Sequence, residues 1–168
     1  MTIAIGCDEA AFELKQALKQ WLLDDGLAVE DFGTFDTQPV LYPDIAFAAA
    51  QSIVEGRNQR AVLLCGTGIG MAISANKVRG IRAAQCHDPY SAERARKSND
   101  AQVITMGARV IGAELAKTIL RAWLAADFEP ARSGPKVARI REFEDNVARP
   151  YSPPDNPPAA IDKPEPKP

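Results

Sequence analysis

Short apolar segments alternate with helical patterns along most of this 168-residue chain. The apolar segments have the length and content of buried strands, and they cover residues 2–6, 27–32, 61–65, 81–86 and 102–106. Helices are predicted at residues 9–25, 43–54, 72–78, from 89 onward, 113–126 and 136–147. Repeated β-α units imply parallel strands joined by right-handed crossovers. The sequence therefore predicts an α/β fold, a five-stranded, parallel, doubly wound, Rossmann-like sandwich with helices on both faces of the sheet.

Length and proline content divide the chain into one domain and a tail. A chain of 168 residues fits a single domain of typical size. Eight of its 13 prolines fall within residues 150–168, where their fixed φ and missing N–H disfavour a helix or a central strand. We expect one folded domain over residues 1–148 and an extended, proline-rich tail over residues 149–168 that takes no part in chemistry.

Charge and composition exclude several classes of protein. Twenty basic against 22 acidic side chains leave a formal charge of −2, whereas nucleic-acid-binding domains usually carry a basic excess. The chain has no apolar run of about 18 residues and no visible export signal, so we expect neither a membrane partner nor secretion. The three cysteines, Cys7, Cys65 and Cys86, are odd in number and lack CxxC spacing. We expect them to be free thiols in a reducing cytoplasm.

Ligands of doubly wound sheets bind beyond the carboxyl ends of the strands, which directs attention to the segments that follow them. Cys65 ends the most apolar segment, and Gly66, Gly68 and Gly70 follow at alternate positions. Glycines let several backbone N–H groups converge on one point, and the next helix adds its positive amino end. Such a nest stabilises an anion, either a phosphate or an enediolate oxygen, and favours the thiolate form of an adjacent cysteine.

Other interpretations of these segments stay open. A dinucleotide site of the GxGxxG type would need glycine where Met71 stands, although Asp88 lies about where a ribose-binding acid is expected. Cys65 could simply be a small core residue in a tight turn. His87 could be a general acid or base, or a capping group. Asp8 could cap the first helix or hold a sugar hydroxyl.

Five ordered segments resemble the ribose-5-phosphate isomerase B family, which includes galactose-6-phosphate isomerase subunits. The segments are GCDEAAFELK near the start, YPDIA at 42–46, LLCGTGIGMAISANKVRGIRAA at 63–84, DPYSAERARKSND at 88–100 and MGARVIG at 106–112. The resemblance runs from about residue 2 to residue 147 and omits only the proline-rich tail. It implies isomerisation of aldose and ketose sugar phosphates, without a metal or cofactor, through a cis-enediol.

The resemblance also implies a role for individual residues. Cys65 matches the base that moves a proton between C1 and C2, and Thr67 the hydroxyl that shuttles protons between O1 and O2. The amides of the loop, from Gly66, Gly68, Ile69 and Gly70, would form the anion hole. Substrate contacts are implied for Asp8, Glu9, Tyr42, Ser98 and Asn99, and phosphate contacts for Arg109, Arg132 and Lys136. Without the resemblance, these last three residues could equally be solvated charges at helix ends.

The resemblance further implies a homodimer with sites at the subunit interface, with a tetramer as the alternative. The apolar positions of the helix at 113–126 are Leu115, Ile119, Leu120, Trp123 and Leu124. They would suit a helix buried between subunits, but they suit an ordinary core helix equally well.

Two departures from the family bear on the substrate. Members that act on ribose 5-phosphate usually carry a ring-opening histidine where this chain has Ser98, and commonly a histidine where it has Glu9. A serine hydroxyl is a poor general acid or base at neutral pH. A four-carbon sugar phosphorylated at O4 cannot close a five-membered ring, because the attacking oxygen is esterified. We therefore expect D-erythrulose 4-phosphate and D-erythrose 4-phosphate as substrates, as in the erythrulose-4-phosphate isomerase branch of the family.

Two alternatives to this function remain. The first is isomerisation of ribose 5-phosphate, with His87 or water opening the ring. The second is a non-catalytic module that binds a nucleotide or a sugar phosphate.

Overall fold

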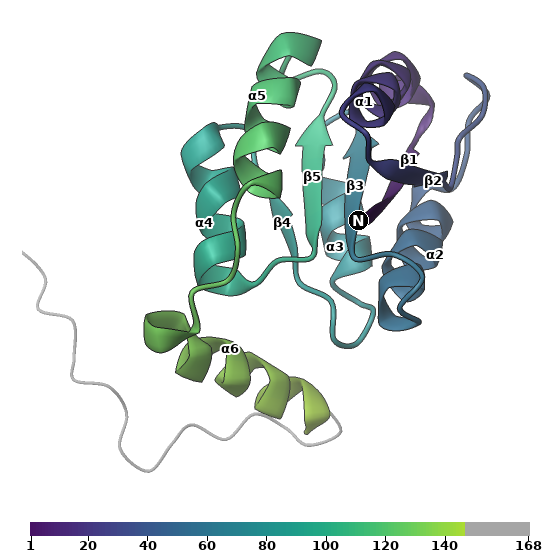
Figure 1. Cartoon of the computed structure of the whole chain (residues 1–168). Coiled ribbons are helices and arrows are strands. Elements are labelled where there is room, and N and C mark those ends of the chain that lie inside the picture. Colours follow the sequence, from purple (N-terminus) through teal and green to yellow (C-terminus); the bar gives the residue numbers. More distant parts are fainter. Residues whose placement is uncertain (147–168) are drawn as a thin grey trace, which may run out of the picture.

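The computed structural model describes residues 1–146, and within them five strands form one parallel sheet in the order β2-β1-β3-β5-β4 (Figure 1). The strands are β1 (Thr2–Cys7), β2 (Ala28–Asp31), β3 (Arg60–Cys65), β4 (Ala83–Gln85) and β5 (Val103–Gly107). The structure confirms the predicted five-stranded α/β fold. The proline-rich tail expected at 149–168 lies outside the described residues.

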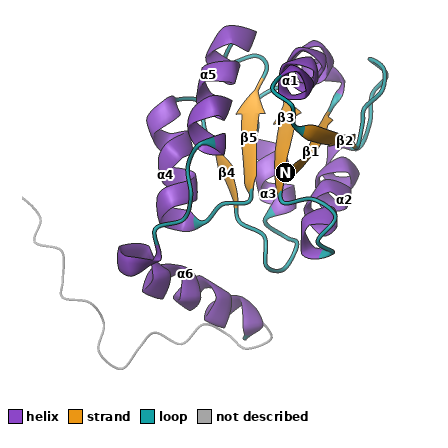
Figure 2. Cartoon of the chain, viewed as in Figure 1, coloured by secondary structure: helices purple, strands orange, loops and turns teal. Residues whose placement is uncertain are grey.

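Helices cover both faces of the sheet (Figure 2). The helices are η1 (Glu9–Ala11), α1 (Phe12–Asp24), α2 (Tyr42–Val54), α3 (Ile69–Ala75), α4 (Pro89–Asn99), α5 (Ala113–Leu124) and α6 (Pro130–Asp145). Helices α1, α4 and α5 share one hydrophobic core, and α2 and α3 share the other. Helix α6 packs against α4 and extends away from the sandwich (Figure 1). No helix within residues 1–146 has the length and apolar character needed to cross a membrane.

Alternation along the strands decides which side chain enters which core. In β3, Val62 and Leu64 belong to the core under α1, α4 and α5, whereas Leu63 and Cys65 belong to the core under α2 and α3. This follows from the two-residue period of a strand, which sends neighbouring side chains to opposite faces. The sulfur of Cys65 is therefore placed at the carboxyl end of β3, on the side covered by α3.

The apolar face of α5 is buried within the chain. Ile119, Leu120 and Trp123 have no solvent exposure and belong to the core shared with α1 and α4. Of the two interpretations open for this helix, the ordinary core helix is confirmed at these three positions.

Several boundaries differ from the predicted ones. Helix α3 begins at Ile69 rather than at residue 72, because Gly68 adopts a left-handed conformation and starts the helix directly. Strand β4 spans three residues rather than the predicted 81–86. Helix α6 begins at Pro130 rather than at residue 136, since a proline suits the first turn, and it accommodates Pro135 in its interior.

A buried ion pair fixes the segment that follows β2. Lys15 has no solvent exposure, and its Nζ lies 2.8 Å from Asp31 Oδ1 and 2.6 Å from the carbonyl oxygen of Thr34. Burial by itself raises the pKa of Asp31, but hydrogen bonds from Lys15 and Lys19 outweigh it and hold the pKa below its ordinary value of 3.8. The Thr34 N–H donates to the carbonyl of Cys7, so the ion pair also secures the end of β1.

We predict that Asp31→Asn lowers the free energy of unfolding by about 3 kcal/mol at pH 7, because it leaves the buried Lys15 charge without its carboxylate. Urea unfolding would measure the change. Asp24→Asn serves as the control, because within residues 1–146 the exposed Asp24 carboxylate accepts a hydrogen bond only from Gln20. This variant should cost less than about 0.5 kcal/mol.

The same pair gives a pH dependence with a definite sign. A depressed native pKa supplies stability that is present above the unfolded pKa and is lost as the pH falls. The difference between wild type and Asp31→Asn should therefore shrink below pH 3.8. If Asp31→Asn and Asp24→Asn lowered the free energy of unfolding equally at neutral pH, this account would be contradicted.

Candidate active site

The Cys65 sulfur and the backbone amides of the glycine loop lie together at the carboxyl end of β3. The N–H of Gly68 donates to Cys65 Sγ at 3.0 Å, and the N–H of Ile69 donates to Thr67 Oγ1 at 3.3 Å. Cys65 is 5% exposed, whereas Thr67 is exposed at the surface of the loop. An N–H group directed at sulfur stabilises negative charge there. The loop thus combines a potential base, a hydroxyl and amide donors at one place.

The loop reaches this shape because its backbone packs directly on β5. Gly68 has a φ of 82°, and a Cβ there would lie 2.9 Å from the carbonyl carbon of Met106. A Cβ at Gly107 would lie 2.7 Å from the backbone of Thr67. Side chains are therefore excluded from both surfaces of this contact, and the loop cannot move away from β5 without losing it.

Side chains from β4 and β5 fasten the same loop. Gln85 Nε2 donates to the carbonyl of Thr67 at 2.6 Å, and Thr105 Oγ1 donates to the carbonyl of Gly68 at 2.8 Å. Neither residue is among the site residues predicted from the sequence. Their only signal was a polar side chain in a strand, which does not reveal its partner.

His87 acts as a backbone clamp. The N–H of Gly107 donates to His87 Nε2 at 2.9 Å, which joins the segment after β4 to the end of β5. Because the Nε2 lone pair is occupied by this hydrogen bond, the geometry favours the capping interpretation of His87 over a general base.

Asp8 brings a carboxylate from β1 to the glycine loop. Its own N–H donates to the carbonyl of Leu64, which ties the ends of β1 and β3 together. Burial and then the charge of Glu9 raise the pKa of Asp8, while the N–H groups of Ala11, Gly66 and Ala10 partly offset that rise. Within residues 1–146 the side chain makes no capping hydrogen bond, and its buried Oδ1 has no partner. A buried acceptor without a donor is costly, and a ligand hydroxyl would relieve that cost.

Three more of the predicted residues border this region. The Tyr42 ring packs on Gly70, where a Cβ would lie 2.6 Å from the phenolic oxygen. The Arg109 side chain runs along Gly66, and the backbone N–H of Arg109 donates to the Gly66 carbonyl at 3.0 Å. Glu9 Oε2 accepts from the N–H of Val40 at 3.3 Å and so holds the segment before α2.

The remaining predicted residues lie at the opposite end of the strands, near their amino ends. Helix α4 starts after the carboxyl end of β4 and ends before the amino end of β5. Ser98 and Asn99, at the end of α4, are therefore near the amino ends of the strands. Arg132 and Lys136 are exposed on α6, which packs against α4 (Figure 1). The length of β5 puts on the order of 15 Å between the amino and carboxyl ends of the strands. A single chain therefore does not bring these four residues to Cys65.

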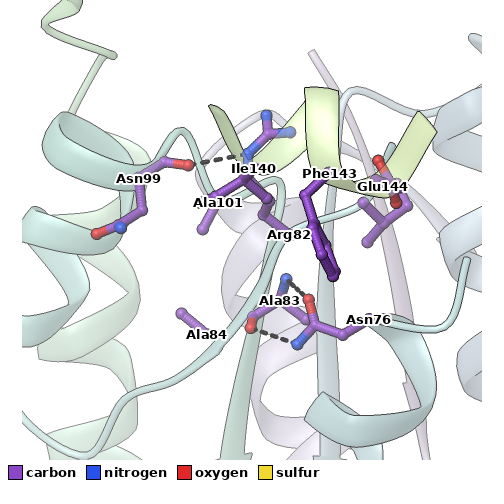
Figure 3. Close-up of a pocket in the computed structure, with 10 residues that line it drawn as sticks. Asn76, Arg82, Ala83, Ala84, Asn99, Ala101, Ile140, Phe143 and Glu144 are labelled. Atoms are coloured by element: carbon purple, nitrogen blue, oxygen red, sulfur yellow. Dashed lines mark hydrogen bonds between the residues drawn. The ribbon is translucent and has the colours of Figure 1, made fainter. Parts of the chain in front are cut away.

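A hollow of about 460 Å³ lies between β4 and α6, near Asn99 (Figure 3). Two of its polar side chains are already engaged: Asn76 pairs with the backbone of Ala83, and Arg82 binds the Asn99 carbonyl and the Asp100 carboxylate. The Asn99 carboxamide points away from Phe143 (Figure 3). The residues that line the hollow do not include any of the Cys65 loop, so the hollow is separate from that loop.

We predict that Gly68→Ala lowers the free energy of unfolding by about 3 kcal/mol, since it adds a clash with β5 to the strain of a left-handed alanine. Gly26→Ala is the matched control, because Gly26 has a φ of 77° with nothing near its Cβ position. It should cost about 1 kcal/mol. Urea unfolding of both variants measures the difference, and equal costs would show that the contact with β5 does not constrain the loop.

Comparisons with known proteins identify the family of this chain. The profile of a family described as Ribose/Galactose Isomerase matches residues 3–140. The chain is 57% identical over 145 residues to the D-erythrulose-4-phosphate isomerase of Pectobacterium atrosepticum, an alignment that covers 86% of this chain and 95% of that protein. It is 54% identical over 144 residues to the Ribose-5-P isomerase B of Listeria innocua, with 86% and 97% covered.

A solved structure gives the same result. The ribose-5-phosphate isomerase B of Clostridium thermocellum superposes with a TM-score of 0.86 at 40% identity, covering 88% of this chain and 99% of that one. This protein belongs to the ribose/galactose isomerase family.

Proposed function

We propose that this chain interconverts D-erythrulose 4-phosphate and D-erythrose 4-phosphate through a cis-enediol, with no metal or cofactor. Its family membership makes it an aldose-ketose sugar-phosphate isomerase. The observation that carries the chemistry is the 3.0 Å contact between the Gly68 N–H and Cys65 Sγ. It gives a thiolate a donor at the point where a carbon-bound proton must be removed.

In the proposed reaction the Cys65 thiolate removes the proton from the carbon next to the carbonyl. The C–H electron pair becomes the C1–C2 double bond of the enediolate, and the carbonyl oxygen takes the negative charge. Thr67 relays the proton between O1 and O2, and the Cys65 S–H then returns its proton to the neighbouring carbon. The amides from Gly66 to Gly70 stabilise the oxyanion, which is more highly charged in the transition state than in the substrate. Their interaction therefore lowers the barrier.

The proposed substrate follows from the hydroxyl at position 98. Opening a furanose ring needs an acid-base group, and Ser98 cannot supply one at neutral pH. Tetrose 4-phosphates need no such step, because their O4 is esterified. Asp8 and Asn99 would contact the hydroxyls of the open chain, and Arg109, Arg132 and Lys136 its phosphate. The Pectobacterium relative is named for this substrate, whereas the Listeria relative is named for ribose 5-phosphate, which remains the second candidate.

A second copy of the chain would complete the site. The separation of Cys65 from Ser98, Asn99, Arg132 and Lys136 is too large for a four-carbon sugar to span within one chain. Apolar side chains near both groups are half exposed, with Ile69 and Ile73 on α3 and Ile140 and Phe143 on α6. We infer a homodimer in which the end of α4 and the start of α6 of one copy face the Cys65 loop of the other. A tetramer built from such dimers is the alternative.

We place this reaction in the cytoplasm. Cys7, Cys65 and Cys86 all lie within the described residues and are free thiols, as expected for a reducing compartment.

The substrate and the base are tested together on purified protein. We expect kcat/KM for D-erythrulose 4-phosphate to exceed that for D-ribose 5-phosphate by about 10²-fold or more, the usual worth of an acid-base catalyst. Cys65→Ser should lower kcat by about 10³-fold and change KM by less than about threefold. Cys86→Ala is the control, because burial raises the pKa of that thiol to about 11 and it takes no part in the proposed chemistry.

Each result has a defined consequence. Faster turnover of ribose 5-phosphate would overturn the substrate assignment. An active Cys65→Ser enzyme would overturn the proposed base.

The shared site predicts complementation between two inactive variants. Cys65→Ser and Arg132→Met each remove one half of every site in a homodimer. When the two proteins are co-expressed, half of the sites in each mixed dimer keep both groups, so the mixture should recover about a quarter of wild-type activity. A mixture no more active than its components would contradict the shared site.

A further inference from the structure

Arg94, to which the family resemblance assigns no role, is hydrogen-bonded to Ser98 on α4. They lie four residues apart, so their side chains meet on one face of the helix. Arg94 Nε and Nη2 donate to Ser98 Oγ at 3.1 Å and 2.7 Å. A serine hydroxyl has two acceptor positions and one proton to donate. With both acceptor positions occupied by Arg94, Ser98 is left as a donor.

The guanidinium of Arg94 makes only a long ion pair with a carboxylate. Among the described residues its ion-pair partner is Glu129, with Oε2 3.8 Å from Nη2, and the Glu129 side chain is 59% exposed. Glu129 is also shared with Lys97, whose Nζ lies 3.6 Å away. Within the part of the chain that the structure describes, Arg94 Nη1 has no hydrogen-bond partner. The pair therefore offers donors from both residues and no acceptor.

A set composed only of donors selects a particular ligand chemistry. Phosphate oxygens accept hydrogen bonds and carry negative charge, and arginine donors match them in both respects. A sugar hydroxyl that must lose its proton needs an acceptor, which this pair lacks. The phosphate of a four-carbon sugar also lies one carbon closer to the reacting carbons than that of a pentose. A cation that serves it must lie correspondingly closer to them.

We propose that Arg94 is a specificity-determining residue. Together with Ser98 it adds a phosphate contact, beside those of Arg109, Arg132 and Lys136, for a four-carbon sugar phosphate held at the Cys65 loop of a second copy. This inference rests on the proposed function, in which the end of α4 contacts the substrate. The phosphate does not change during isomerisation, so the contact is equally strong in the ground state and the transition state. It acts on KM rather than on kcat.

The test compares Arg94→Leu with wild type in steady-state assays. We expect Arg94→Leu to raise KM for D-erythrulose 4-phosphate by about 10-fold to 100-fold, the range for lost charged hydrogen bonds, with kcat changed by less than about threefold. For D-ribose 5-phosphate, kcat/KM should change by less than about threefold. Arg94→Lys retains the charge but not the two-pronged geometry, and should raise KM by an intermediate factor.

Arg57→Leu is the matched control. Arg57 is an exposed arginine paired with Glu30 and Glu55 and lies near β2, at the far side of the sheet from β4. Its replacement removes the same charge and should leave both substrates unaffected. Thermal unfolding of each variant verifies folding. Ser98→Ala removes only the hydroxyl and should give a smaller rise in KM for the four-carbon substrate, so the inference can be tested even if Arg94→Leu does not fold.

The outcomes separate the inference from the proposed function. A wild-type enzyme that turns over neither sugar phosphate refutes both. A wild type that prefers the four-carbon substrate, with Arg94→Leu kinetically equal to Arg57→Leu, refutes the Arg94 contact alone. Equal KM increases for both substrates would also refute it, because Arg94 would then bind phosphate without discriminating chain length.

Discussion

The hydrogen bond from the Gly68 amide to the Cys65 sulfur is the interaction on which the site depends. It forms only because Gly68 is left-handed and its bare backbone lies against Met106 in β5. That contact in turn requires β5 to lie beside β3, although β4 comes between them in the sequence. Strand order is thus a precondition of the chemistry, since another neighbour for β3 would leave the loop without its support.

Polar groups at the ends of two further strands, β1 and β4, surround this contact. β1 contributes the Asp8 carboxylate, and its end is held by the Cys7 backbone bonds that depend on Lys15 and Asp31. The segment after β4 contributes His87 as a clamp on Gly107. These bonds lie on either side of β3, so the sulfur sits at the point where the chain diverges toward both edges of the sheet. A doubly wound sheet provides such a crevice from its topology alone.

The parts that could be predicted from the sequence are those determined by local chemistry. The apolar run ending at Cys65 and the alternate glycines identified the strand, the turn and the amide nest, because each follows from backbone sterics. The roles of Gln85 and Thr105 could not be predicted, since they depend on which carbonyl a distant loop presents. The start of α6 at Pro130 differs from the predicted one because glycine and proline are unfavourable inside a helix, and this helix nevertheless includes both at 134–135. The Arg94–Ser98 pair has a readable signal in its four-residue spacing, but no local feature of the sequence connects it with a substrate.

The candidate site is divided between the carboxyl and the amino ends of the strands, and this division follows from the direction of α4. A helix that links parallel strands must run antiparallel to them, so residues at its carboxyl end lie far from the carboxyl ends of the strands. Under the proposed function, one copy supplies the thiol and the amides, and the other supplies groups that recognise the rest of the sugar. The thiol and amides act on carbons that every aldose and ketose shares, whereas the end of α4 faces the part that differs between sugars. Substitutions at positions such as 94 and 98 can therefore change the preferred chain length while the Cys65 loop keeps its geometry.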